Sequence, residues 1–156
     1  SRIKKENTSM KILICGLSGS GKSTLAEPFA NLIGGIWLNA NAVRKQYDDW
    51  DFSTKGRLRQ TLRMTHIADG IVMAGKIAVA DFICPTHITR DWFNADYTVW
   101  MDTIKESQYQ DTDAVFEKPK HYDYHVAKWF DNTHTELVKV VNNYMLAQAG
   151  KPTERL

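Results

Sequence analysis

The strongest constraint in the sequence is a glycine-rich stretch close to its beginning. Residues 16–23 read G-L-S-G-S-G-K-S, which fits the pattern G-x-x-x-x-G-K-[ST] at every fixed position. A short apolar run at residues 11–15 precedes this stretch, and a helical pattern at residues 21–33 follows it. In such a loop, backbone N–H groups and the N-terminus of the helix together hold an anionic polyphosphate. The motif therefore predicts a strand–loop–helix unit that binds the phosphates of a nucleotide.

The chemistry of the loop and of a second acidic position predicts the cofactor site. Lys22 can reach the β- and γ-phosphates of ATP, and the Ser23 hydroxyl can ligate Mg²⁺. The apolar run at residues 77–81 ends in Asp81, and a carboxylate at the end of a neighbouring strand can hold the same ion. We therefore predict Ser23 and Asp81 as metal ligands. The predicted ATP-binding residues are Gly16, Ser18, Gly19, Ser20, Gly21, Lys22, Ser23 and Thr24.

The rest of the sequence alternates short apolar runs with stretches of helical periodicity. We expect strands at residues 11–15, 36–38, 76–83 and 97–101, and helices at 21–33, 41–47, 54–74, 89–93 and 133–149. Thr133 and Glu136 fit a capping box at the start of the last helix. Strands that alternate with helices favour parallel crossovers, so we predict the P-loop NTPase fold, an α/β fold with a parallel sheet covered by helices on both faces.

Length and composition predict one globular domain. The chain has 156 residues, of which 43% are hydrophobic and 24% charged, and these proportions exclude a disordered chain. We expect a flexible polar leader at residues 1–9 and a single domain at residues 10–156. Residues 103–122 lack clear periodicity, and we interpret them as a long loop or lid.

Charge and cysteine content narrow the choice of partner and compartment. The net charge of +2 is too small for nucleic-acid binding through bulk electrostatics alone, although a local basic patch stays open. No run of about 18 apolar residues occurs, so we expect no membrane partner. Cys15 and Cys84 lie far apart in apolar runs, which indicates buried thiols and favours a reducing, cytoplasmic location.

Among proteins with this loop, small kinases fit the sequence best. The guanine-reading motif N-K-x-D and the switch motif D-x-x-G of GTPases do not occur in the sequence. The chain is also short for an ATPase motor with its own transmission elements. We therefore predict a kinase that uses ATP and Mg²⁺ to phosphorylate an alcohol group.

Further segments resemble the adenylylsulfate kinase family, over residues 11 to about 100. Residues 16–26 are similar to the family's opening G-L-S-G-S-G-K-S-T-L-A, and W-L-N-A-N-A-V-R at residues 37–44 resembles its L-D-G-D-N-V-R stretch. Residues 51–53, Gly56-Arg57 with Gln60, and residues 82–85 stand where the family has G-F-S, D-R-x-x-N and F-I-S-P. The resemblance implies transfer of the γ-phosphoryl group of ATP to the 3′-hydroxyl of adenosine 5′-phosphosulfate.

The resemblance also implies roles for individual residues. Arg44 and Arg57 would bind the phosphate or sulfate of the acceptor, and Phe52 would stack on its base. These roles suit the side chains, because arginine offers paired donors to oxyanions and an aromatic ring offers a flat face to a base. The predicted acceptor-binding residues are Asn39, Arg44, Phe52, Arg57, Gln60 and Ile83, and the predicted catalytic residues are Lys22, Asn41, Asp81 and Arg44.

Two departures from the family pattern motivate an alternative. Asn39 and Asn41 replace the two aspartates of L-D-G-D, and an asparagine cannot accept a proton as a general base. The family's R-D-x-K-G-L-Y lid signature is also absent. The alternative is a catalytically weak protein that binds ATP.

A second likeness keeps a nucleic-acid acceptor open. Residues 39–44 also resemble the N-x-D-x-x-R stretch of polynucleotide 5′-kinases, again with Asn41 at the aspartate position, and phage-type kinases of hydroxymethyl-pyrimidines in DNA belong to the same group of candidates. A basic helix face could contact such an acceptor, although the favoured interpretation of these charges is a solvated helix face. A small nucleotide-like acceptor is the leading partner, and a homodimer is kept open. The residues considered for the basic face are Arg57, Arg59, Arg63 and His66.

Overall fold

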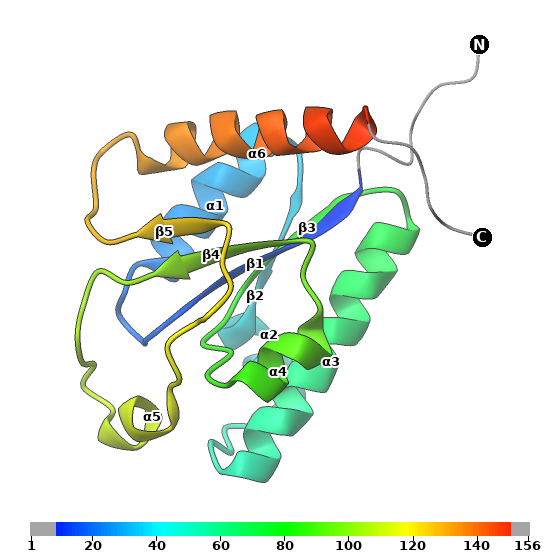
Figure 1. Ribbon diagram of the computed structural model, residues 1–156. Helices are drawn as coiled ribbons and strands as arrows, with labels where there is room; N and C mark the ends of the chain where they lie inside the picture. The colour runs from blue at the N-terminus through cyan, green and yellow to red at the C-terminus, as the bar shows by residue number, and fades with distance from the viewer. Residues whose placement is uncertain (1–8, 151–156) are drawn as a thin grey trace.

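A five-stranded parallel sheet forms the centre of the computed structural model, which describes residues 9–150. The strands follow the order β2-β3-β1-β4-β5. Helices cover both faces, as Figure 1 shows. The elements are β1 Met10–Gly16, α1 Lys22–Ile33, β2 Ile36–Asn39, α2 Ala40–Tyr47, α3 Thr54–Met73, β3 Ile77–Asp81, α4 His87–Phe93, β4 Tyr97–Met101, α5 Gln110–Val115, β5 Tyr124–Val126 and α6 Thr133–Ala149.

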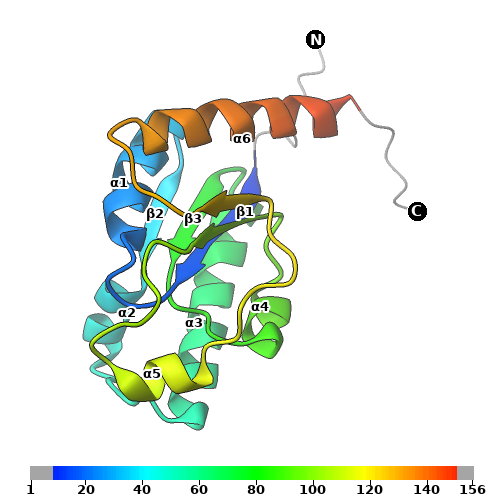
Figure 2. The same ribbon diagram turned by 60° about the vertical axis from the view of Figure 1, so that its left-hand side comes forward.

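The central strand β1 is buried on both faces and divides the core into two clusters. Its side chains alternate, so Ile12 and Ile14 face one cluster while Leu13 and Cys15 face the other. Helices α1 and α6 pack on the first face, and α3 and α4 pack on the second (Figures 1 and 2). A strand buried on both sides reads as a continuous apolar run, which is the pattern of residues 12–15.

The order of the strands places a site at the carboxyl ends of β1, β3 and β4. From β1 the chain crosses to β2 and then β3 on one side, before β4 and β5 extend the sheet on the other side. In open parallel sheets, the point where the direction of winding changes leaves a crevice beyond the carboxyl ends of the strands. The loop of residues 17–21, between β1 and α1, lies at this point.

The predicted fold class is confirmed, and so are the four predicted strands and the predicted helices, with small differences at their ends. Helix α5 and strand β5 were not predicted; α5 lies inside the segment that we expected to be irregular. The predicted capping box at Thr133 is wrong, because Asn132 is the N-cap and the Thr133 hydroxyl donates to the carbonyl of Phe130 at 2.7 Å. A capping box occurs instead at α4, between Thr86 and Thr89.

Two further sequence predictions concern the ends of the chain and membranes. The expected leader at residues 1–9 lies outside the described residues except for Ser9, and so do the last six residues of the expected domain. Among the helices of residues 9–150, none is long and apolar enough to cross a membrane.

We predict that Gly56→Ala destabilises the protein by about 1–3 kcal/mol, the usual cost of forcing extra atoms into a packed site. A Cβ atom at Gly56 would lie 2.0 Å from the carbonyl oxygen of Asp51, so the loop before α3 would have to move. The matched control is Gly70→Ala in the same helix, where a Cβ would meet nothing within 4 Å. This control should stabilise the helix by about 1 kcal/mol. Urea unfolding of both variants measures the difference, and equal effects would contradict the predicted clash.

Candidate active site

The loop between β1 and α1 is shaped by glycines and tied to its surroundings by side chains. Gly19 and Gly21 have φ angles of 83° and 98°, in the left-handed region that glycine adopts without strain. The Thr103 hydroxyl donates to the carbonyl of Ser20 at 2.7 Å, which joins the loop to the segment after β4. The chain therefore curls around an open space at the N-terminus of α1, where backbone N–H groups suit an anion.

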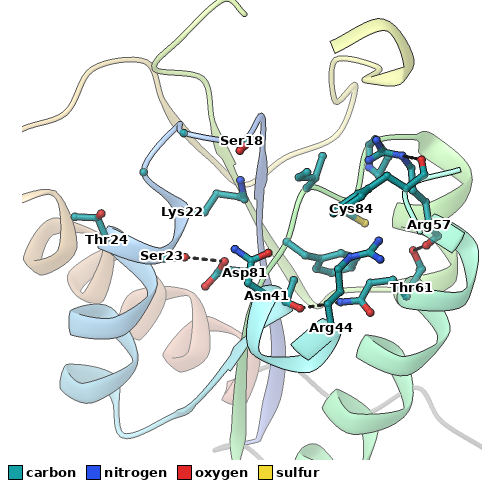
Figure 3. Close-up of a pocket in the computed structure, with 18 residues that line it drawn as sticks. Ser18, Lys22, Ser23, Thr24, Asn41, Arg44, Arg57, Thr61, Asp81 and Cys84 are labelled. Carbon is teal, nitrogen blue, oxygen red and sulfur yellow. Dashed lines mark hydrogen bonds between the residues drawn. The ribbon is translucent and has the colours of Figure 1, made fainter. Parts of the chain in front are cut away.

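A cavity of about 310 Å³ opens beside this loop. Figure 3 shows Lys22 and Ser23 on one side of it, Arg44 and Arg57 on the other, and Asp81 between them. Its walls come from the loop, from the first turns of α2 and α3, and from the segment after β3. The lining residues are Ser18, Gly19, Gly21, Lys22, Ser23, Thr24, Ala40, Asn41, Arg44, Phe52, Arg57, Gln60, Thr61, Asp81, Phe82, Ile83, Cys84 and Pro85.

The lining includes most residues that the sequence predicted for the site. Lys22, Ser23 and Thr24 of the loop reach the cavity, and so does Asp81 from the end of β3. Gly16 and Ser20 do not line it; the Ser20 side chain is buried and its hydroxyl has no hydrogen-bond partner among the described residues. Of the predicted acceptor-binding residues, all except Asn39 line the cavity.

Asp81 is buried and held by donors from two other elements. Its carboxylate accepts hydrogen bonds from Trp37 Nε1 at 2.5 Å, from Asn39 Nδ2 at 3.2 Å and from Ser23 Oγ at 3.3 Å. Burial raises the pKa of Asp81, while these donors and the nearby Lys22 ammonium oppose that rise.

Asn39, which we predicted to bind the acceptor, does not line the cavity, and its side chain is engaged within the protein. Its Oδ1 accepts from the backbone N–H of Ala42 and thereby caps α2, and its Nδ2 donates to Asp81 and Ser23. Both ends of the amide are therefore used within the protein. The neighbouring Asn41 does line the cavity and is exposed.

Lys22 is the first residue of α1, and its ammonium group turns back to the preceding loop. Its Nζ donates to the carbonyl of Leu17 at 2.9 Å. Burial lowers the pKa of Lys22 to about 8, and the attraction of Asp81 counteracts only part of this effect. The ammonium therefore begins to lose its proton slightly above neutral pH, and a bound anion would favour the protonated form.

Arg44 is 4% exposed and is fixed by the loop between α2 and α3. Its Nη1 donates to the carbonyl of Asp49 at 2.8 Å and to the carbonyl of Asp51 at 3.2 Å. Its guanidinium carbon lies 4.1 Å from the centroid of the Phe52 ring. Phe52 therefore covers the arginine as well as lining the cavity.

Arg57 is 9% exposed and joins α3 to the unpredicted helix α5. Its Nε donates to the carbonyl of Phe52 and its Nη2 to the hydroxyl of Thr112, both at 2.8 Å. Burial lowers the pKa of both Arg44 and Arg57. Within residues 9–150, neither guanidinium forms an ion pair with a carboxylate. Backbone carbonyls and one hydroxyl therefore hold the two cations without a direct ion pair, and the Asp81 carboxylate lines the same cavity.

The two aspartates near Arg44, Asp49 and Asp51, are engaged by another arginine. Arg59 donates to Asp49 at 2.7 and 3.0 Å and to Asp51 at 3.1 Å, and Arg63 also donates to Asp49. These contacts hold the pKa of Asp49 well below its usual range. The possible basic face does not form a continuous free surface, because Arg59 and Arg63 are paired with carboxylates and Arg57 lines the cavity.

A sheet with this strand order, a phosphate-type loop and a cationic chamber beside it define a small P-loop kinase. The family model described as Adenylylsulphate kinase matches residues 8–118. The chain belongs to the adenylylsulfate kinase family. It is therefore an ATP-dependent phosphotransferase with a hydroxyl group as acceptor.

Solved structures of several kinases share the fold. The Mycobacterium tuberculosis APS kinase CysC in complex with AMPPNP and APS has a TM-score of 0.69 and 19% identity, with 90% of this chain and 98% of that chain covered. A shikimate kinase from Acinetobacter baumannii in complex with shikimate has a TM-score of 0.57 and 16% identity, with 95% and 99% covered. No match was found among the curated proteins. These comparisons support neither a nucleic-acid acceptor nor the homodimer that we kept open.

We predict that the affinity for ATP falls as the pH rises through about 8, the pKa of Lys22 in the free protein. Only the ammonium form attracts the triphosphate, so binding above this pH must be accompanied by uptake of a proton. Calorimetry in buffers of different ionisation enthalpy measures both quantities. Lys22→Arg, whose charge persists at high pH, should flatten the profile. An unchanged affinity up to pH 9.5 in the original protein would disprove the assignment.

Proposed function

We propose that the chain transfers the γ-phosphoryl group of ATP to a hydroxyl of a small nucleotide-like anion of the adenylylsulfate type. The observation that carries this proposal is the pair of buried guanidinium groups of Arg44 and Arg57, neither of which has a carboxylate partner among the described residues. Two buried cations without a direct ion pair favour a bound molecule that supplies negative charge. A phosphate or sulfate group meets this requirement, and arginine binds both through paired donors.

Phe52 supports a nucleotide-like acceptor. Its ring lines the cavity and is 39% exposed, so it offers a face on which a base can stack. Its carbonyl holds Arg57 and its ring covers Arg44, so the same residue positions both cations. An acceptor with an anionic group next to a planar base would use these three side chains together.

The residues on the opposite side of the cavity suit MgATP. Ser23 Oγ and Asp81 Oδ1 lie 3.3 Å apart, and hydroxyl and carboxylate oxygens are ligands that Mg²⁺ accepts. Mg²⁺ in phosphoryl-transfer sites is usually held by one or two protein oxygens together with water and substrate phosphates, and this pair offers two such oxygens. Ser23 and Asp81 would hold the ion, which would neutralise charge on the phosphates when bound.

The protein's own contribution to the reaction is positioning and charge. The loop amides and Lys22 would hold the triphosphate, and Arg44 and Arg57 would orient the acceptor so that its hydroxyl meets the γ-phosphate. Phosphoryl transfer passes through a loose transition state, so these terms supply most of the rate. A strong base contributes less, and for this reason Asn41 does not exclude catalysis.

The cysteines bear on where such a kinase acts. Cys15 and Cys84 are both free and buried, and burial raises the pKa of the Cys15 thiol to about 11. Thiols of this kind are unreactive and need no oxidising environment. We infer a cytoplasmic location, where ATP is also available.

The test is transfer of label from γ-labelled ATP to a panel of acceptors. We expect adenosine 5′-phosphosulfate or a similar small nucleotide to be labelled, and single-stranded or duplex oligonucleotides to remain unlabelled. Lys22→Ala should abolish transfer, because it removes the cation that faces the phosphates. If ATP binds and no acceptor is labelled, the chain is the weak ATP-binding protein of the alternative reading, which the exposed amide of Asn41 favours.

A second prediction concerns Asn41, which lines the cavity without a described hydrogen-bond partner. Asn41→Asp should raise the turnover by about 100-fold if this position lacks a general base, the usual range for acid–base catalysis. The increase should appear in kcat rather than in the KM for ATP. Steady-state kinetics with the best acceptor of the panel measure it, and an unchanged kcat would place the proton-accepting group elsewhere.

A further inference from the structure

Asn39 and Asp81 lie side by side at the carboxyl edge of the sheet. They end the neighbouring parallel strands β2 and β3 and are register partners. Asn39 Nδ2 lies 3.4 Å from Oδ1 and 3.2 Å from Oδ2 of Asp81. Ser23 Oγ is almost equally far from the two side chains, at 3.1 Å from Asn39 Nδ2 and 3.3 Å from Asp81 Oδ1. A carboxylate at either position would therefore meet the same hydroxyl.

The contacts around the pair require one amide and one carboxylate. Asn39 Oδ1 already accepts from the backbone N–H of Ala42, and Asp81 Oδ2 accepts from Trp37 Nε1. The remaining atoms face each other, so one side must donate and the other must accept. Two carboxylates here would repel, and two amides would leave the site without charge. In either arrangement of the two residue types, an oxygen remains for Ala42 and an oxygen for Trp37.

We propose that Asn39 is a positioning residue that makes the ends of β2 and β3 a single-carboxylate site, and that either strand can supply this carboxylate. The proposal rests on the Mg²⁺-dependent nucleotide binding assigned above to Ser23 and Asp81. In the exchanged pair N39D/D81N, the carboxylate at position 39 still caps α2, and the amide at position 81 donates to it while accepting from Trp37. The charge stays beside Ser23.

The experiment compares N39D, D81N and the exchanged pair by calorimetry of ATP with and without Mg²⁺, which needs no acceptor. D81N should lower the enhancement of ATP affinity by Mg²⁺ about 10- to 100-fold, the usual effect of losing a group that supports a bound metal. The exchanged pair should regain most of this loss. The matched control is N41D/D81N, which places the carboxylate on an exposed residue of the same cavity that does not contact Asp81, and it should regain little.

Unfolding temperatures provide a second readout without any ligand. N39D alone should lower the unfolding temperature because it creates a carboxylate pair, and adding D81N should restore it. The proposal is overturned if the exchanged pair responds to Mg²⁺ as weakly as D81N and unfolds at as low a temperature as N39D. It is also overturned if N41D/D81N regains as much of the Mg²⁺ response as the exchanged pair does. If D81N does not fold, a cooperative transition regained by the exchanged pair supports the proposal, and failure to regain it overturns it. If Mg²⁺ has no effect on ATP binding by the original protein, the proposed function is contradicted instead. The unfolding temperatures would then still show whether the carboxylate and the amide can exchange places.

Discussion

The in-register pairing of β1 with β3 and β4 is the constraint on which the site depends. It places Ile14 beside Asp81 and Gly16 beside Met101, so the phosphate-type loop and the acidic strand end emerge at the same edge of the sheet. A Cβ at Gly16 would lie 2.5 Å from the carbonyl oxygen of Met101, which shows how closely the loop leaves the sheet. The distances around Asp81 follow from this alignment rather than from the loop alone.

The charge around Arg44 depends on the partners of the nearby acidic side chains. Asp49 forms ion pairs with Arg59 and Arg63. Arg44 therefore donates hydrogen bonds to the α2–α3 loop only at backbone carbonyls. These carbonyls orient the guanidinium without neutralising it. Arg44 therefore has no direct ion pair in the described part of the chain, while the ion pairs of Asp49 with Arg59 and Arg63 tie the loop that carries Phe52 to α3.

The sequence was sufficient for the fold and for the nucleotide side of the site, because both depend on local patterns. The spacing of Gly16 to Ser23 and the apolar run before Asp81 specify their conformation through neighbours in the chain. The arginines and Phe52 required the family resemblance, since nothing in their spacing reveals a shared cavity. Their roles toward an acceptor stay predictions.

The elements that the sequence did not reveal are held by contacts between distant residues. Helix α5 has six residues and is held by hydrogen bonds from Arg57 to Thr112 and from Ser107 to Asp113. A helix this short shows too little periodicity in the sequence to be predicted. Strand β5 is three residues long and exists because β4 pairs with it. The contact between Asn39 and Asp81 was not predicted for the same reason, since the two residues are neighbours only across the sheet.

The two faces of the sheet contribute different parts of the molecule. Residues that line the acceptor side of the cavity come from α2, α3 and the segment after β3, while α1 and α6 build the opposite core cluster. Acceptor preference can therefore diverge by changes on one face without disturbing the packing of the other. The shared architecture of proteins named for different acceptors, such as an APS kinase and a shikimate kinase, accords with this separation between a constant scaffold and a variable chemical surface.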